Sequence, residues 1–257
     1  MPGTAANNLN VRAVVRAVAI LNSFVNQPNQ TLAEVTHATQ LDKGTTRRLL
    51  LTLMTTGLIR FDPAAQRYSL GRAILTLATS VIDTFDIRTI AGPVLKQLSE
   101  ELQTTAFLSV YQDGQAFCIE RIHGLGGMEV RWWNVGTALP PNCGAAPKVL
   151  LAHQPQAEID RILASPLTAM TPKSMTDPVQ LRERLALIRE RGWELAADDV
   201  ALGLTALATP CFSPTGETIA SISIGGLTPQ MVSRGKPAHL DKLLAAAAEI
   251  TDLCSAA

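Results

Sequence analysis

Two helix start signals, eleven residues apart, constrain this chain more than any other feature of its sequence. Thr31 is followed three residues later by Glu34, and this capping-box spacing predicts a helix over residues 32–39. After a short turn, Asp42 is suited to the N-cap of a second helix over residues 43–54. Two capped helices joined by a tight turn are the pattern of a helix-turn-helix.

A short hairpin and a first helix complete this module. Gly57 is expected to end the second capped helix, and two β runs, 58–61 and 67–70, then flank a turn at residues 62–65. The helix at the start carries one apolar stripe, expected to face the core and formed by Val14, Val18, Leu21 and Val25. The sequence therefore predicts a winged helix-turn-helix over residues 11–72, preceded by a flexible N-terminus at 1–10.

The charge of the chain is divided unevenly. The whole sequence has 22 basic and 22 acidic residues. Residues 11–72 hold eight of the basic and three of the acidic residues, which gives 8 − 3 = +5, so the remainder carries 14 − 19 = −5. A basic module joined to an acidic body indicates that only the module meets a polyanion.

Basic and hydroxyl side chains gather in the first half of the second capped helix. This is the part of a recognition helix that faces base edges in the major groove of double-stranded DNA. The candidate DNA-binding residues are Lys43, Thr45, Thr46, Arg47 and Arg48, with Arg67 on the wing. A pair of arginines can also be a solvated face of an ordinary helical bundle. The two caps, the wing and the local charge together favour DNA binding.

The segment after the wing is expected to link two domains. A helix over residues 72–85 has an apolar stripe formed by Ile74, Ala78, Val81 and Phe85. This stripe either pairs with a second copy or packs on its own domain, and we assign residues 73–88 as a linker and dimerisation helix. Gly92 and Pro93 are expected to restart the chain into another helix that ends near Gln103.

The body, residues 89–257, alternates strands and helices. "TAFLSVY" and "QAFCIERI" flank an Asp-Gly turn, which predicts a hairpin, and "MEVRWWNVG" is expected as a third strand. "LTALATPCFS" and "TIASISIGG" are two further strands. Helices are expected in "GAAPKVLLAH", with Pro147 in its first turn, and over 157–163, 181–191 and 237–253. Antiparallel strands with helices around them predict an α+β domain.

These motifs resemble those of the IclR family of transcriptional regulators over nearly the whole chain. The resemblance lies in "TLAEVTHATQLDKGTTRRLLLTLMTTGLIRF" and "QRYSLG", and in the body at "VGTALPPNCGAAPKVLLA" and "IRERGWELAADDVALGLTALATPCF". It implies a winged helix-turn-helix, a linker helix and a C-terminal effector-binding domain with a GAF-like or profilin-like sheet. It also implies a homodimer or dimer of dimers on operator DNA, with a small organic acid as effector.

The effector pocket implied by the resemblance is more apolar here than in members that bind small keto acids. Ala196, Ala206 and Gly225 stand where relatives carry polar groups, and Pro147 and Val149 depart from the family pattern around Lys148. We therefore expect an organic acid with an aromatic body. The candidate effector-binding residues are Arg131, Trp133, Leu139, Ala145, Ala146, Ala206, Ser221 and Ser223.

Two of these assignments have alternatives. Arg131 is placed to take a carboxylate, but it can instead pair with an acid such as Glu129 or Asp198. Trp132 and Trp133 are more often core or interface residues than ligand stackers.

An enzyme acting on a small carboxylate through a GAF-like domain is the alternative function. Cys143 precedes a helix N-terminus, where the pKa of a thiol falls. However, none of the four histidines is tied to it by a motif. The adjacent Asp198 and Asp199 are expected as turn or surface acids, and neither a P-loop nor a dinucleotide motif occurs. We therefore expect no catalytic residues. A purely structural DNA-bridging protein would not need so large a mixed body.

The remaining features favour a cytoplasmic protein without a metal or cofactor. The four cysteines form no CxxC pair, which argues against zinc. No window reaches eighteen uninterrupted apolar residues, and the first ten residues lack the pattern of a secretion signal. No membrane partner is expected.

Overall fold

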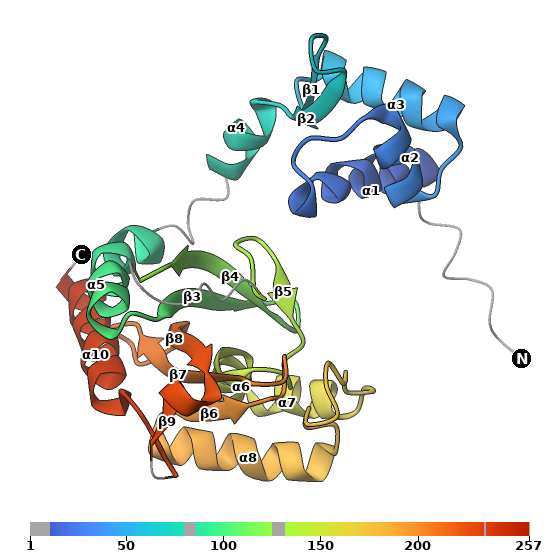
Figure 1. Ribbon diagram of the computed structural model, residues 1–257. Helices are drawn as coiled ribbons and strands as arrows, with labels where there is room; N and C mark the ends of the chain where they lie inside the picture. The colour runs from blue at the N-terminus through green and yellow to red at the C-terminus, as the bar shows by residue number, and fades with distance from the viewer. Residues whose placement is uncertain (1–10, 80–85, 125–131, 234, 257) are drawn as a thin grey trace, which may run out of the picture. The chain divides into compact units, whose positions relative to one another are not determined.

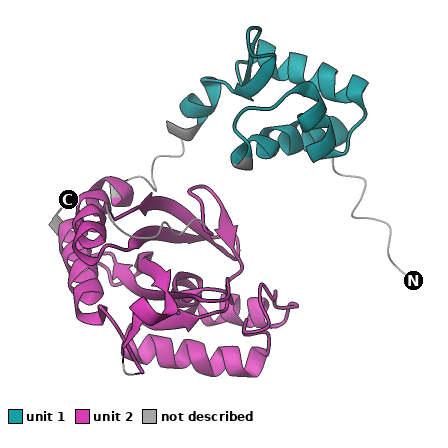
Figure 2. Ribbon diagram, viewed as in Figure 1, with its two compact units in different colours: residues 1–83 teal, residues 84–257 magenta. Residues whose placement is uncertain are grey.

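The chain divides into two compact units, Met1–Asp83 and Thr84–Ala257 (Figure 2). A computed structural model describes residues 11–79, 86–124, 132–233 and 235–256. Each unit is described by itself below. Within these ranges, no helix has the length and apolar character that crossing a membrane requires.

The first unit consists of three helices, a hairpin and a fourth helix (Figure 1). Its elements are α1 (Arg12–Asn26), α2 (Leu32–Thr39), α3 (Lys43–Thr55), β1 (Ile59–Asp62), β2 (Arg67–Leu70) and α4 (Ala73–Thr79). The strands are antiparallel, with Asp62 opposite Arg67. The predicted winged helix-turn-helix is therefore confirmed.

Both predicted helix caps are present. The Thr31 hydroxyl accepts a hydrogen bond from the Glu34 N–H at 3.3 Å, and the Thr31 N–H donates to Glu34 Oε2 at 2.6 Å. The Asp42 Oδ1 accepts from the Thr45 N–H at 2.8 Å. Each cap satisfies an N–H that has no partner inside the helix, so the starts of α2 and α3 are fixed by local chemistry.

The predicted buried face of α1 is wrong for three of its four residues, whereas Leu21 is partly buried and packs against the core. The residues of α1 that are buried in the core of this unit are Ile20 and Phe24, whereas Val14, Val18 and Val25 are 59%, 47% and 47% exposed. The helix has apolar residues on two sides, so its periodicity does not decide which side packs. The contacts with α2 and α3 decide it, through core residues such as Val35 and Leu50.

The second unit contains a six-stranded antiparallel sheet in the order β5-β4-β3-β8-β7-β6. The strands are β3 (Thr105–Gln112), β4 (Gln115–Ile122), β5 (Ala138–Leu139), β6 (Glu194–Ala197), β7 (Leu204–Phe212) and β8 (Thr218–Leu227). A separate short hairpin is formed by β9 (Val232–Ser233) and β10 (Lys236–Pro237), after α9 (Thr228–Met231). The predicted α+β class is confirmed.

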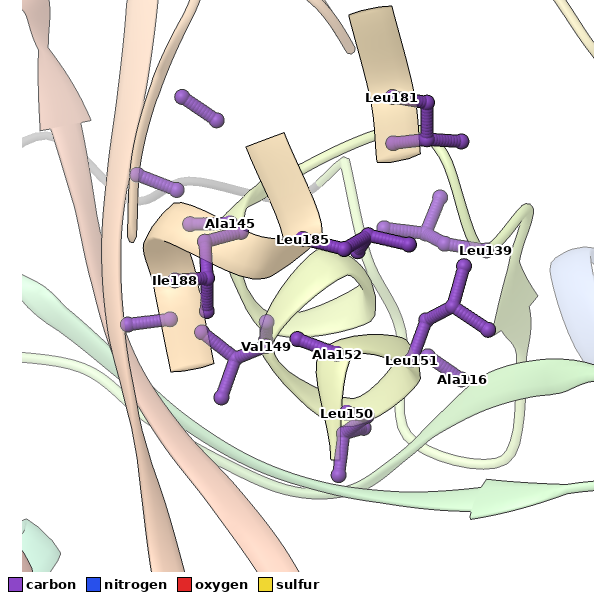
Figure 3. Close-up of a cluster of buried hydrophobic side chains, with 14 of the residues drawn as sticks. Ala116, Leu139, Ala145, Val149, Leu150, Leu151, Ala152, Leu181, Leu185 and Ile188 are labelled. Atoms are coloured by element: carbon purple, nitrogen blue, oxygen red, sulfur yellow. The ribbon is translucent and has the colours of Figure 1, made fainter. Parts of the chain in front are cut away.

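Helices cover both faces of this sheet. On one face, α5 (Asp86–Leu102) and α10 (Leu240–Ala256) lie side by side (Figure 1). On the other face lies α6 (Ala145–Ala152), with α8 (Pro178–Arg191) packed against it and α7 (Gln156–Leu163) against α8. Every residue of α6 is buried, and its apolar side chains meet those of α8, including Leu185 and Ile188 (Figure 3).

Two predictions of local structure in the second unit are wrong. The helix α5 continues through Pro93 instead of starting at Gly92. Its buried side, Ile87, Ala91, Leu95 and Leu98, runs unbroken past Pro93, which lies on the exposed side. Burial of that stripe outweighs the hydrogen bond that proline removes.

The predicted third strand is wrong over its described part. Trp132 and Trp133 lie in bends, and the strand β5 begins only at Ala138. Both indoles pack on the same aromatic cluster, with ring centroids 6.0 Å from that of Phe107. Strand alternation would have placed them on opposite faces.

Candidate functional site

The exposed side of α3 carries most of the predicted DNA-binding residues. Lys43, Arg47 and Arg48 are exposed, and Thr45 is half-buried beside its cap. Thr46 is a correction, because it is 0% exposed and its hydroxyl donates to the Asp42 carbonyl at 3.0 Å. Thr46 lies on the side of α3 that faces the core, so its side chain cannot contact a duplex.

Sequence reasoning missed a leucine on the same exposed side. Leu51 is 49% exposed, although its neighbour Leu50 is completely buried. It lies four residues after Arg47 and three after Arg48, so the three side chains share one face of α3. That spacing was the available signal. Arginine reads guanine or clamps phosphate, and an apolar side chain suits the methyl group of thymine.

The wing residue Arg67 also holds the unit together. Its Nη1 donates to the Asn29 carbonyl at 2.9 Å and to Glu34 Oε2 at 3.2 Å. The pKa of Glu34 is lowered because its carboxylate accepts hydrogen bonds from the N–H and the hydroxyl of Thr31. The positive charge of Arg67 lowers it further. Arg67 is thus bound within the unit, with 41% of its side chain still exposed.

In the second unit, small residues form a row across the sheet on the side of α6. Ala196 lies opposite Ala206 in the ladder of β6 and β7, and Ala206 lies opposite Gly225 in that of β7 and β8. Along this row, three neighbouring strands therefore carry side chains no larger than a methyl group. Ser223 is on the same face, because the alternating Ile222 and Ile224 pack toward α5 and α10.

The predicted effector residues in the described part are brought to this side of the sheet. Ala145 and Ala146 begin α6, and they share one buried cluster with Leu139, Ala206 and Trp133. Ser221 is buried, and its hydroxyl donates to the Thr209 carbonyl at 3.0 Å, which uses its single donor inside the sheet. Arg131 and its alternative partner Glu129 lie outside the described residues.

The two tryptophans differ in their hydrogen bonding. Trp133 is 2% exposed and its Nε1 donates to the Thr137 carbonyl at 3.0 Å, as expected of a core residue. The Nε1 of Trp132 is buried and has no hydrogen-bond partner in the structure as described.

A buried ion pair connects α6 to the loop between β6 and β7. The Lys148 ammonium donates to Asp199 Oδ2, and the same oxygen accepts from the Gly144 N–H at 3.0 Å. The expectation that Asp199 is a surface acid is therefore wrong, since its side chain is 7% exposed. Asp198 is a turn residue as predicted, with φ of 62° and its carboxylate accepting from the Gly203 N–H.

Cys143 has the environment of a structural thiol. It is completely buried, and burial raises its pKa above the ordinary value. Its sulfur donates to the Thr168 carbonyl at 3.3 Å. A nucleophilic cysteine needs the opposite shift, so the geometry gives no support to the enzyme alternative.

Two family descriptions match this chain. The IclR helix-turn-helix domain matches residues 13–63, and the C-terminal domain of the bacterial transcriptional regulator IclR matches residues 79–252. The chain belongs to the IclR family. The resemblance inferred from the sequence motifs is thereby confirmed.

Named relatives agree with this membership. The chain is 27% identical to the HTH-type transcriptional regulator KipR of Bacillus subtilis over 241 residues, which is 93% of this chain and 96% of KipR. It is 28% identical to the transcriptional repressor IclR of Escherichia coli over 221 residues, 84% of this chain and 80% of that repressor.

A solved IclR regulator has the same fold. The structure from Alicyclobacillus acidocaldarius has a TM-score of 0.78 and 26% identity, and the match covers 96% of this chain and all of that one. The IclR family consists of transcriptional regulators rather than enzymes, so α1–α3 with the wing form the DNA-binding domain, and the six-stranded unit is the effector domain.

Proposed function

We propose that this IclR-family regulator acts in the cytoplasm as a homodimer or dimer of dimers on operator DNA. In this proposal α3 reads the operator, and a small organic acid with an apolar, aromatic body binds the effector domain and changes the affinity for DNA. The observation that carries the proposal is the exposed face of α3, where Arg47, Arg48 and Leu51 lie together on a chain whose formal net charge is zero.

The chemistry of this face suits direct reading of bases. Two guanidinium groups can each make paired hydrogen bonds to guanine or bind a phosphate, and Leu51 can contact thymine. Lys43 and Thr45 lie at the start of α3, where a recognition helix approaches the groove. Arg67 on the wing is proposed to contact the DNA backbone with the part of its guanidinium that stays exposed.

The two-fold assembly follows from the reading geometry. One α3 contacts one half-site, so a palindrome requires two copies. The predicted stripe on α4 includes Ile74, which is half-buried, while Leu75 and Leu77 are 69% and 57% exposed. Val81 and Phe85 lie outside the described residues. We propose that exposed leucines of α4 contribute to the contact between copies.

The aromatic body of the effector is inferred from the row formed by Ala196, Ala206 and Gly225. The side chains of this row are no larger than a methyl group, and edge atoms of the Phe107 and Trp132 rings lie 3.4–3.9 Å from the position that a Cβ of Gly225 would take. Ser223 and the N–H groups of Ala145 and Ala146 at the start of α6 are proposed as further donors. Arg131 is proposed to take the carboxylate, on the sequence alone.

The first probe comes from a protein of the same fold. An IclR homologue from Microbacterium hydrocarbonoxydans, with a TM-score of 0.82 and 23% identity over 95% of this chain and all of that one, was crystallised with 4-hydroxybenzoate. We therefore propose to test 4-hydroxybenzoate, benzoate and pyruvate on the full chain, first by thermal shift and then on DNA selected from random sequences.

The proposal predicts that an aromatic acid raises Tm and changes the affinity for the selected DNA, because a ligand that favours one state shifts the equilibrium toward it. A Tm raised by pyruvate but by neither aromatic acid would contradict the aromatic body. Equal affinity for selected and scrambled DNA would contradict operator reading.

A further inference from the structure

The two adjacent tryptophans place one free hydrogen-bond donor at the effector site. The indole N–H of Trp133 is bonded to the Thr137 carbonyl, whereas that of Trp132 is buried without a partner among the described residues. A buried donor without an acceptor is unfavourable, because it has lost water and gained nothing in return. Such groups are few in native structures, and each asks for an explanation.

The Trp132 indole lies directly on the small-residue row. A Cβ built on Gly225 would lie 3.8 Å from Cζ2 and 3.9 Å from Nε1 of Trp132, and 3.4 Å from the Phe107 ring. A side chain at position 225 would therefore be in van der Waals contact with the edge of the indole that carries the free N–H. A larger side chain at this position would have to share the space with both aromatic rings.

Side chains around Gly225 do not supply the missing acceptor, since the Trp132 N–H bonds neither of the hydroxyls beside Gly225 on this face, those of Ser223 and Thr105. Ala206 and Ala196 offer only methyl groups, and both are buried at 5% exposure. The carbonyls of a central strand are used in the ladder to the adjacent strands. Among the described residues this donor has no acceptor, so we take an oxygen from outside the chain as its partner at the row.

We infer that the Nε1–H of Trp132 is a hydrogen-bond donor to the effector, and that it binds an oxygen of a planar acid lying against Ala206 and Gly225. This inference rests on the proposed function, since it names a residue that would recognise the proposed ligand. The acceptor is a carboxylate or a phenolic oxygen, and the acid meets the indole at its Nε1–H edge beside Phe107.

Replacing each tryptophan by phenylalanine separates this role from a packing role. Trp132→Phe keeps an aromatic ring and removes a donor without a partner, so Tm without ligand should stay unchanged or rise. Trp133→Phe is the matched control, because it removes a donor that is bonded inside the protein and should lower Tm by roughly 2–4 °C. Both variants are made in the full chain and compared with wild type.

Ligand affinity is then measured by calorimetry with 4-hydroxybenzoate, benzoate and pyruvate. For an acid that binds wild type, Trp132→Phe should weaken binding by roughly 10- to 100-fold, and Trp133→Phe by less than about threefold. In parallel, the indole N–H proton resonance assigned to Trp132 should move downfield when that acid is added, as it does when a donor gains an acceptor.

The outcomes distinguish the two claims. An acid that binds wild type and Trp132→Phe equally well, with no shift of the Trp132 resonance, would overturn this inference and leave the proposed function standing. Binding of none of the acids to wild type would contradict both. A drop in Tm for Trp132→Phe as large as that for Trp133→Phe would mean that removing the Trp132 donor costs as much as removing a bonded one, and this too would overturn the inference.

Discussion

Lys148 and Asp199 form an ion pair inside the effector domain, where their side chains are 4% and 7% exposed. The pair joins α6, which lies over the sheet, to the loop that follows β6. The same carboxylate oxygen accepts the Gly144 N–H just before α6 begins. The Asp199 carboxylate thus holds both the N-terminus of α6 and Lys148, the only charged residue of this buried helix, next to the proposed effector site.

Breaking this pair should destabilise the effector domain. Lys148→Met removes the ammonium and leaves a buried carboxylate without its ion-pair partner, which costs about 3–5 kcal/mol of unfolding free energy. Urea denaturation followed by circular dichroism measures the loss. The double variant Lys148→Met with Asp199→Leu removes both charges, so it should lose less than the sum of the single variants. An additive result would mean that the two groups do not interact.

Neighbouring leucines on α3 should have opposite effects on folding and on DNA binding. Leu50 is 0% exposed, so Leu50→Ala should cost about 2–5 kcal/mol of unfolding free energy. Leu51→Ala changes an exposed residue and should alter stability by less than about 0.5 kcal/mol. Leu51→Ala should nevertheless weaken binding to DNA selected from random sequences.

Replacing thymines by deoxyuridine in that DNA should weaken the binding of the wild type and leave the binding of Leu51→Ala unaffected. A normal affinity for Leu51→Ala would remove this leucine from the reading surface.

The capping box should make the DNA-binding domain sensitive to acid. Hydrogen bonds from Thr31 are the main reason that the pKa of Glu34 is lowered in the folded chain. A lowered pKa contributes stability above the unfolded value of about 4.3, and this contribution is lost as the pH falls through the folded pKa.

Helix content of residues 11–72 should therefore fall as the pH drops below about 4.3, and Glu34→Gln should reduce that dependence while keeping an acceptor for the Thr31 N–H. Circular dichroism between pH 6 and pH 2.5 measures both proteins. Identical acid profiles would show that the Glu34 charge does not stabilise α2.

The caps and the wing could be predicted from sequence because their interactions join residues close in the chain. Thr31 binds Glu34 three residues away, and Asp42 binds Thr45 at the same spacing. The partner of Lys148 is 51 residues away, and no local pattern identifies it. A lysine within an apolar helix does indicate a buried partner, and that was the available signal.

The misplaced side chains have a common physical cause. Val14 and Val18 are exposed because tertiary packing selected Ile20 and Phe24, and Thr46 is buried because α3 turns it toward the core. Trp132 was expected on a strand, where it would point away from Trp133. In each case the choice between two faces of one element depends on its neighbours in space, which periodicity does not specify.

The central claim is that α3 reads the operator sequence, and the affinities of Arg47→Ala and Arg48→Ala test it most directly. Both are measured by fluorescence anisotropy against selected and scrambled duplexes at fixed salt, with Lys173→Ala as a control that removes one exposed charge from the effector domain.

At least one arginine variant should lose about 1–3 kcal/mol on the selected duplex and less on the scrambled one, because a base contact is lost. Lys173→Ala should bind as wild type. Unchanged affinity of both arginine variants for the selected duplex would contradict the claim that α3 is the reading helix.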